Sequence, residues 1–253
     1  FQTQAALSDA ELDTLCSQDD KEVYVRNLER VADLTISGDG ILLDGQGAGG
    51  SARADSLTNT ATMTGNLVIS GNDTVIRGID FTSSGEKAIS FVSGATNVTF
   101  QDCKFTQGSG VGDTGKWFYG DFLAGNVTIT NCRIEGFRDV YLADFSSSSS
   151  FTMEGALVRV RVKRNYFKNC RGCIAARGKL GSPAKLVQYS SNLFETNELH
   201  SSFWDQIECS NAVLRVVVTD NEAIYPVGTD TQASQKFGFC QIWSQDPKPF
   251  TVE

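Results

Sequence analysis

The stretch Val98-Thr99-Phe100-Gln101-Asp102-Cys103-Lys104-Phe105 carries the pattern that decides the fold: apolar-x-apolar-x-x-small or polar-x-apolar. Apolar residues at every second position predict two short strands, and the polar residues between them predict a turn. Six other stretches follow the same pattern, with Thr74 and Ala223 as weak members: 34–41, 74–81, 127–134, 160–167, 187–194 and 216–223. Such repetition predicts short parallel strands that stack in successive coils.

The organisation of the chain follows from this repeat. No linker separates the first copy from the last, and the intervals between copies vary as loops of different length would make them. We therefore predict a single all-β domain over residues 1–253. It consists of an amino-terminal cap helix (1–20), a parallel β-helix or solenoid (21–225) and a carboxyl-terminal tail or assembly segment (226–253).

Each end of the predicted solenoid has its own signal. Ser8-Asp9-Ala10-Glu11 has the form of a capping box, and the helix that it starts would carry Leu7, Leu12 and Leu15 on one side. Such a helix would cover the open amino end of the coil, where strands lack neighbours. At the other end, the segment after Ile224 breaks the repeat and contains Pro226, Pro247 and Pro249. We expect it to leave the coil and either cover the carboxyl end or dock on a neighbouring molecule.

The cysteines favour a protein that folds in a reducing compartment. There are seven, an odd number, and Cys103 and Cys132 occupy the same column of the repeat. Stacked coils would place these two thiols one above the other inside the core, unbonded. Cys170 and Cys173 have the spacing of half a zinc site, but the second half is missing and His200 is the only histidine. We predict no metal and no cofactor.

Composition narrows the partners. The net charge is −8, so we expect no nucleic acid partner, because binding phosphates requires a concentrated basic surface. No apolar stretch is long enough to span a bilayer, so we expect no membrane insertion.

One segment adds a resemblance to a known superfamily. Ile41-Leu42-Leu43-Asp44-Gly45-Gln46-Gly47, together with the stacked repeat and its Asn/Cys column, resembles the right-handed parallel β-helix of the pectin-lyase-like superfamily. The resemblance implies a right-handed coil over about residues 20–225. It implies no single function, because this superfamily includes lyases, hydrolases, phage tailspikes, adhesins and silent virion parts.

The enzymes of the superfamily resemble this chain poorly at their active sites. Polygalacturonases use Asn-Thr-Asp, Asp-Asp and Gly-His-Gly motifs, and none of these stands in the repeats. Pectate lyases combine a calcium site with an arginine base, and the nearest approximation here is Asp139, Asp144 and Arg177. These residues would form either a surface ion pair between stacked strands or a cation site with Arg177 as base or clamp.

Aromatic residues supply a second candidate site. Trp117, Tyr119, Tyr141 and Trp204 lie in segments expected at one strand position of different coils. Alternation would turn Trp117, Tyr119 and Trp204 outward, where rings can stack on a sugar chain or contact a protein. The alternative is that these rings pack beneath loops.

The functional prediction is a non-catalytic structural or adhesive protein. It would be a bacteriophage or viral virion component (tail, fibre or capsid decoration) that contacts surface glycans and has other virion proteins or its own copies as partners. It would lie on a virion or an extracellular surface after assembly in a reducing cytoplasm. The alternatives are a polysaccharide lyase or glycoside hydrolase acting on an acidic polysaccharide, and a bacterial surface adhesin.

Overall fold

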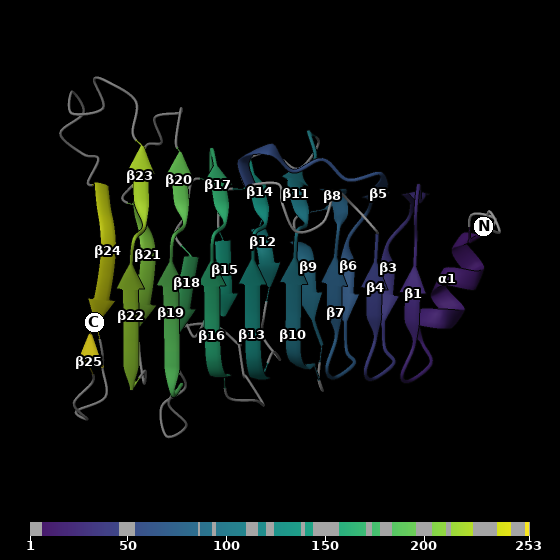
Figure 1. Cartoon of the computed structure of the whole chain (residues 1–253), viewed down its shortest axis with the longest axis horizontal. Coiled ribbons are helices and arrows are strands. Elements are labelled where there is room, and N and C mark those ends of the chain that lie inside the picture. The colour runs from purple at the N-terminus through teal and green to yellow at the C-terminus, as the bar shows by residue number, and fades with distance from the viewer. Residues whose placement is uncertain are drawn as a thin grey trace.

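The computed structural model describes residues 7–45, 54–85, 87–92, 95–109, 116–119, 124–137, 140–143, 157–170, 174–177, 184–195, 204–210, 214–224, 237–243 and 251–252. Its elements are one α-helix, one 3-10 helix and short strands that all pair in parallel (Figure 1). No described helix is long and apolar enough to cross a membrane.

The strands form four parallel sheets, named here A to D. Sheet A has nine strands: β1 (Glu22–Tyr24), β4 (Leu42–Asp44), β7 (Val75–Arg77), β10 (Thr96–Gln101), β13 (Ala124–Thr130), β16 (Leu157–Lys163), β19 (Leu186–Ser190), β22 (Arg215–Thr219) and β25 (Thr251–Val252). Sheet B has eight strands: β2 (Glu29–Val31), β5 (Ala61–Thr64), β8 (Ile79–Ser83), β11 (Lys104–Gln107), β14 (Arg133–Glu135), β17 (Tyr166–Lys168), β20 (Leu193–Glu195) and β23 (Glu222–Ile224).

Two shorter sheets complete the stack. Sheet C contains β3 (Leu34–Ile36), β6 (Leu67–Ile69), β9 (Lys87–Phe91) and β12 (Lys116–Tyr119). Sheet D contains β15 (Val140–Ala143), β18 (Ile174–Arg177), β21 (Trp204–Ser210) and β24 (Phe237–Trp243). Strands β12 and β15 lie side by side, so sheet D continues the stack of sheet C. The chain therefore visits A, then B, then C or D, and returns to A one strand further along.

This path confirms the prediction of stacked parallel strands. One of the seven predicted repeat copies, however, joins a different pair of sheets from the others. Six of the repeat copies run from a strand of sheet A to a strand of sheet B, but the copy at 34–41 runs from β3 in sheet C to β4 in sheet A. The true first copy is Val23, Val25, Leu28 and Arg30, whose side chains are all buried. It is hard to recognise because a charged arginine stands where the repeat has an apolar residue.

An aromatic column fills the interior on the sheet B side. Phe81 and Phe105 stack with ring centroids 5.1 Å apart, and Phe167 and Phe194 stack at 5.0 Å. Trp117 lies between these pairs, 5.3 Å from Phe105 and 6.4 Å from Phe167. Offset or tilted pairs of this kind stabilise a core beyond the area that they bury. The predicted inward orientation of Phe105 and Phe167 is confirmed.

A second column joins the coils at the corner between sheets A and B. Here Asn165 accepts hydrogen bonds from the Cys132 amide (2.8 Å), and Asn192 accepts them from the Asn165 amide (3.0 Å). Asn221 does the same for the Asn192 amide at 3.0 Å. Cys103 and Cys132 occupy the first positions of this column as buried free thiols, as predicted. Each side chain thus satisfies a backbone group of the coil before it, which a buried corner requires.

The backbone at this corner explains the spacing of the repeat. The residue before each of these column positions has a left-handed conformation, with φ of 52–55°: Asp102, Asn131, Arg164, Ser191 and Asp220. A single left-handed residue turns the chain sharply enough to start the next strand after one more residue. The turn therefore has the same length in every coil except the second, where residues 45–60 separate β4 from β5, whereas the loops at the other corners vary throughout.

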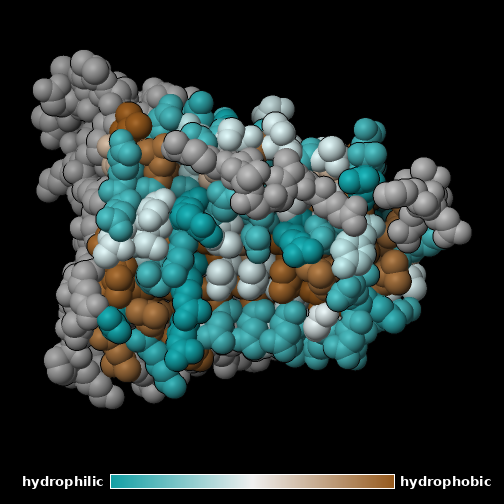
Figure 2. Space-filling view, viewed as in Figure 1, coloured by the Kyte–Doolittle hydropathy of each residue, from teal (hydrophilic) through white to brown (hydrophobic). Residues whose placement is uncertain are grey.

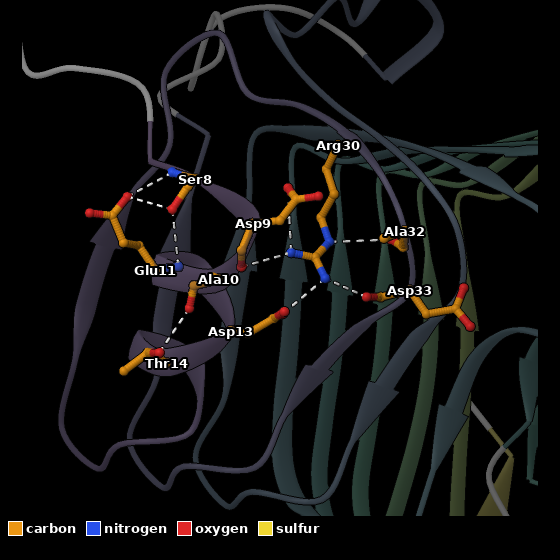
Figure 3. Close-up of polar contacts among 9 residues, drawn as sticks. All are labelled: Ser8, Asp9, Ala10, Glu11, Asp13, Thr14, Arg30, Ala32 and Asp33. Carbon is orange, nitrogen blue, oxygen red and sulfur yellow. Dashed lines mark hydrogen bonds and ion pairs between the residues drawn. The ribbon is translucent and has the colours of Figure 1, made fainter.

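The predicted cap helix is confirmed as α1 (Asp9–Cys16). Ser8 Oγ accepts from the Glu11 amide at 3.3 Å, and Glu11 Oε2 accepts from the Ser8 amide at 2.9 Å, which completes the capping box (Figure 3). Leu12 is fully buried, and Leu7 and Leu15 pack partly buried against the core. The helix therefore covers the amino end of the stack (Figure 1).

Arg30 fastens this helix to the first coil. Its guanidinium donates to Asp13 Oδ1 at 2.9 Å and to three carbonyl oxygens: Asp9 (3.2 Å), Ala32 (3.3 Å) and Asp33 (2.6 Å) (Figure 3). Backbone pairing places Arg30 beside Met63, and Met63 beside Phe81, so the arginine stands at the end of the aromatic column. Only 3% of it is exposed, and a buried cation is tolerated because its donors have acceptors.

The structure corrects the prediction for the carboxyl-terminal segment. β24 pairs in parallel with β21, and β25 pairs in parallel with β22. The expectation that the chain leaves the coil after residue 225 is therefore wrong for 237–243 and 251–252, which add to sheets D and A. Prolines predicted the end of the sheets, but Phe237–Trp243 restores the alternation that pairing requires.

Candidate functional site

The structure contradicts the predicted aromatic site at Trp117. Trp117 is fully buried in the aromatic column, so the expectation that its ring faces outward is wrong. Its strand follows a loop of variable length, and nothing in the local sequence fixes which alternate positions face inward. Trp117 is a core residue of β12.

The other three aromatic residues belong to the C/D stack but do not form one row. Tyr119 ends β12, Tyr141 lies in β15 and Trp204 begins β21. Tyr141 pairs with Ala175, and Ala175 pairs with Glu208, so the backbone of Trp204 lies several residues away from the Tyr141 row. Their side chains lie outside the described part of the structure, so their exposure stays a prediction.

The acidic cluster is likewise not assembled by the described residues. Arg177 ends β18, where its backbone pairs with Ser210 of β21. Asp139 and Asp144 lie outside the described residues. The role of these three residues in catalysis stays a prediction.

The described residues contain a different candidate, a row of basic side chains along β16. Val160 and Val162 are fully buried, and the residues that alternate with them are Arg159, Arg161 and Lys163. Because successive side chains of a strand point to opposite faces, these three basic residues lie on the outer face of sheet A. We call them the basic row. Figure 2 shows a band of strongly hydrophilic surface that follows β16 across this face.

The strands that flank β16 carry neutral polar residues beside the basic row. On one side, Thr128 pairs with Arg161 and Thr130 with Lys163; on the other, Gln188 pairs with Arg161 and Ser190 with Lys163. Strand neighbours lie about 4.8 Å apart, so these hydroxyl and amide groups border the basic row closely. No carboxylate occupies a position directly opposite the basic row on either flanking strand.

The basic row differs from Arg77, another basic residue on the outer face of sheet A. Arg77 of β7 forms an ion pair with Asp44 of β4, with Nη2 and Oδ2 2.7 Å apart. This bond is the main reason that the pKa of Arg77 is raised. Arg159, Arg161 and Lys163 form no ion pair or hydrogen bond with any residue that the structure describes. Arg77 therefore has a structural partner, whereas the residues that the structure describes provide none for the basic row.

Sequence reasoning missed this site although the signal was present. The segment Arg159-Val160-Arg161-Val162-Lys163 alternates basic and apolar residues, and the repeat frame assigns the valines to the core. The overall charge of −8 obscured a local concentration of positive charge on one strand.

Sheet B has a more closed outer face, because residues 54–59 cross it. The Arg133 guanidinium donates to the Asp55 carbonyl at 2.7 Å, and Asn59 Nδ2 donates to Asp80 Oδ1 at 2.7 Å. Ala54 and Leu57 pack against Tyr166 in a small cluster separate from the main core. Burial beneath this segment raises the pKa of Asp80, and the hydrogen bond from Asn59 opposes the effect. The arrangement accounts for Asp80 as a structural residue.

The thiols are inert by their surroundings. Burial raises the pKa of both Cys16 and Cys170 to about 12 and also raises the pKa of Cys132. A thiol with a raised pKa holds little thiolate at neutral pH, so it is a poor nucleophile. Among the described residues, no group of three or more His, Cys, Asp or Glu side chains is placed to hold a metal ion.

Comparison with known proteins gives no assignment. No family model matches the chain, and no curated protein matches it.

Proposed function

We propose that this chain is a right-handed parallel β-helix of the pectin-lyase-like type that serves as a non-catalytic structural or adhesive element. In this proposal it is a bacteriophage or viral virion component that contacts surface glycans and assembles with other virion proteins or with its own copies.

The observation that carries the proposal is the continuity of the internal columns. The asparagine column uses the polar side chains at one corner to bind successive coils, and the aromatic column fills the space between sheets B and C. Side chains used in this way make a stiff rod, because each coil is held by the coils on both sides. A stiff rod with exposed sheet faces suits a scaffold or adhesive element.

The state of the cysteines supports assembly in a reducing compartment. Cys16, Cys103, Cys132 and Cys170 are buried free thiols. Secreted proteins that fold in oxidising compartments tend to pair their cysteines, whereas cytoplasmic folding leaves them reduced. Virion proteins assembled inside a host cell fit the second case.

The test separates binding from turnover. The protein is incubated with acidic and neutral polysaccharides, with and without Ca²⁺, while reducing ends and unsaturated products are followed and binding is measured by calorimetry. We expect binding to at least one glycan without turnover. Turnover that is lost in Arg177→Ala or Asp144→Asn would replace the proposal with a polysaccharide lyase.

A further inference from the structure

The basic row on β16 poses a physical problem that the fold does not explain. Arg159, Arg161 and Lys163 stand at alternate positions of one strand, so the Cα atoms of neighbouring basic residues are about 6.6 Å apart. Like charges this close repel one another and disfavour the folded state. With no carboxylate beside them on the flanking strands, the described structure offers no compensation.

A fourth basic residue extends the positive surface. Arg164 follows β16 at the tight corner, where its left-handed backbone (φ 55°) leaves the side chain exposed. Arg159 is also exposed, whereas Arg161 and Lys163 are half-buried. The half-buried pair lies between residues of β13 and β19 that carry hydroxyl and amide groups.

Positive charge is concentrated in and around β16. Residues 157–170 contain five basic residues and no acidic residue: Arg159, Arg161, Lys163, Arg164 and Lys168. The amino-terminal part, residues 9–44, contains three basic residues (Lys21, Arg26 and Arg30) against ten acidic ones (Asp9, Glu11, Asp13, Asp19, Asp20, Glu22, Glu29, Asp33, Asp39 and Asp44). An acidic partner that covered a large part of sheet A would therefore be repelled by the acidic residues at the amino-terminal end of the sheet.

We propose that the basic row is a binding site for an acidic oligosaccharide, whose carboxylate or sulfate groups pair with Arg159, Arg161 and Lys163. This inference deepens the proposed function and rests on it, because it names the ligand class and the surface. Guanidinium groups bind carboxylate and sulfate through paired, charge-assisted hydrogen bonds. The row spans about 13 Å along the strand, which suits a short stretch of a single extended chain.

The neutral neighbours of the basic row favour a sugar over other polyanions. Thr128, Thr130, Gln188 and Ser190 offer donors and acceptors beside the charges, and sugar hydroxyl groups need both. Nucleic acid interfaces are larger, about 1,000–2,500 Å² of protein surface, and strongly positive throughout. The basic row is one strand wide on an acidic protein, so it fits a narrow ligand with spaced charges.

The test measures binding of defined oligomers by calorimetry at several salt concentrations. The probes are an oligogalacturonate, a sulfated dextran oligomer, an uncharged dextran oligomer of the same length and a single-stranded DNA oligomer. We expect one of the two acidic sugars to bind, the uncharged dextran to bind more weakly, and binding to weaken as salt rises.

Paired variants locate the site. Arg161→Gln with Lys163→Gln should raise the Kd for the acidic sugar by about tenfold or more, because two charge-assisted contacts are lost. Arg161→Lys alone keeps the charge and should change the Kd less than Arg161→Gln. The matched control, Lys21→Gln with Arg26→Gln, removes the same charge from the first coil, about 24 Å away across five strand spacings, and should leave the Kd within about twofold.

Each of the other outcomes would contradict a specific part of the proposal. An unchanged Kd in the β16 variant, or an equal loss in the Lys21/Arg26 control, would overturn this site while leaving glycan binding by the protein intact. Tighter binding of DNA than of either acidic sugar would replace the ligand class. Failure of the native protein to bind any sugar would overturn the glycan-contacting part of the proposed function as well. Because the replaced side chains point outward, thermal unfolding of each variant checks that the fold is kept.

Discussion

Asn192 occupies the most fully connected position of the asparagine column, and its replacement by alanine tests how the coils are held together. Its Oδ1 accepts from both the backbone amide and Nδ2 of Asn165, each at 3.0 Å. Its Nδ2 donates to the Val162 carbonyl at 2.9 Å and to Asn221 Oδ1 at 2.8 Å. The side chain is 1% exposed, so water cannot replace these partners without opening the core.

The expected loss of stability follows from counting the hydrogen-bonding groups that lose a partner. In Asn192→Ala the buried amide of Asn165 loses its acceptor, which costs about 1–3 kcal/mol, and the bonds to Val162 and Asn221 cost about 0.5–1.5 kcal/mol each. The total loss in the free energy of unfolding is therefore about 2–6 kcal/mol. Nδ2 of Asn165 keeps its bond to the Ile129 carbonyl (3.0 Å), so it adds little.

The measurement is equilibrium unfolding in urea, followed by circular dichroism and by tryptophan fluorescence, with the midpoint compared at a common slope. Thr219→Ala is the control, because Thr219 is an exposed residue of β22 near the same corner and its loss should change stability by less than about 0.5 kcal/mol. Asn192→Asp keeps one oxygen but buries a charge, so it should destabilise more at neutral than at acidic pH. A loss below about 1 kcal/mol in Asn192→Ala would refute the view that this column holds the coils together.

Three further predictions concern single sites. Arg30→Met matches the methionine of the next coil in shape but removes the hydrogen bonds to α1. Hydrogen exchange should then show that the amides of α1 lose protection while those of sheet A stay protected. Unchanged protection of α1 would contradict the role of Arg30 in fastening the helix. Cys103 and Cys132 should react with a thiol reagent only after unfolding, because both side chains are fully buried and out of reach of the reagent; fast labelling of the native protein, or a disulfide between them, would contradict this. Burial raises the pKa of Asp80 in the folded state above the ordinary value of 3.8, so its contribution to stability is present in acid and lost as pH rises through the folded pKa. Asp80→Asn, which keeps an acceptor for Asn59, should therefore raise the melting temperature at neutral pH and lose this gain in acid; a lower melting temperature at neutral pH would refute it.

The stacking of the strands could be predicted from the sequence because one corner has the same length in seven of the eight coils, all but the one between β4 and β5. Between sheets A and B a single left-handed residue precedes the column position, so the pattern from Val98 to Phe105 recurs with fixed spacing. The other corners contain loops of different length, and strands beyond them have no fixed distance from the repeat. Side-chain direction reverses with a shift of one residue, which is why the orientation of Trp117 was predicted wrongly.

The contacts made by the segments that cover the stack could not be predicted from the repeat, since they lie outside the repeating pattern. Arg30 can stand in an apolar column only because α1 supplies hydrogen-bond acceptors at the end of the core. No local sequence pattern predicts that contact. The segment at 54–59 crosses several coils of sheet B, and its contacts with Arg133 and Tyr166 join residues far apart in the sequence. Long-range contacts of this kind follow from the assembled coils and not from any one of them.

The basic row shows that the outward positions of a strand with alternating inward and outward residues are the most informative about function. In such a strand the inward positions are constrained by packing, and here they are valines in β16 and β22 alike. The outward positions are free of that constraint, so a departure from neutral polar residues there needs another explanation. Sheet A presents threonine, glutamine and serine on β10, β13 and β19, but arginine and lysine on β16. Since charge repulsion on one strand works against the fold, the basic row is better explained by a ligand that neutralises it than by stability.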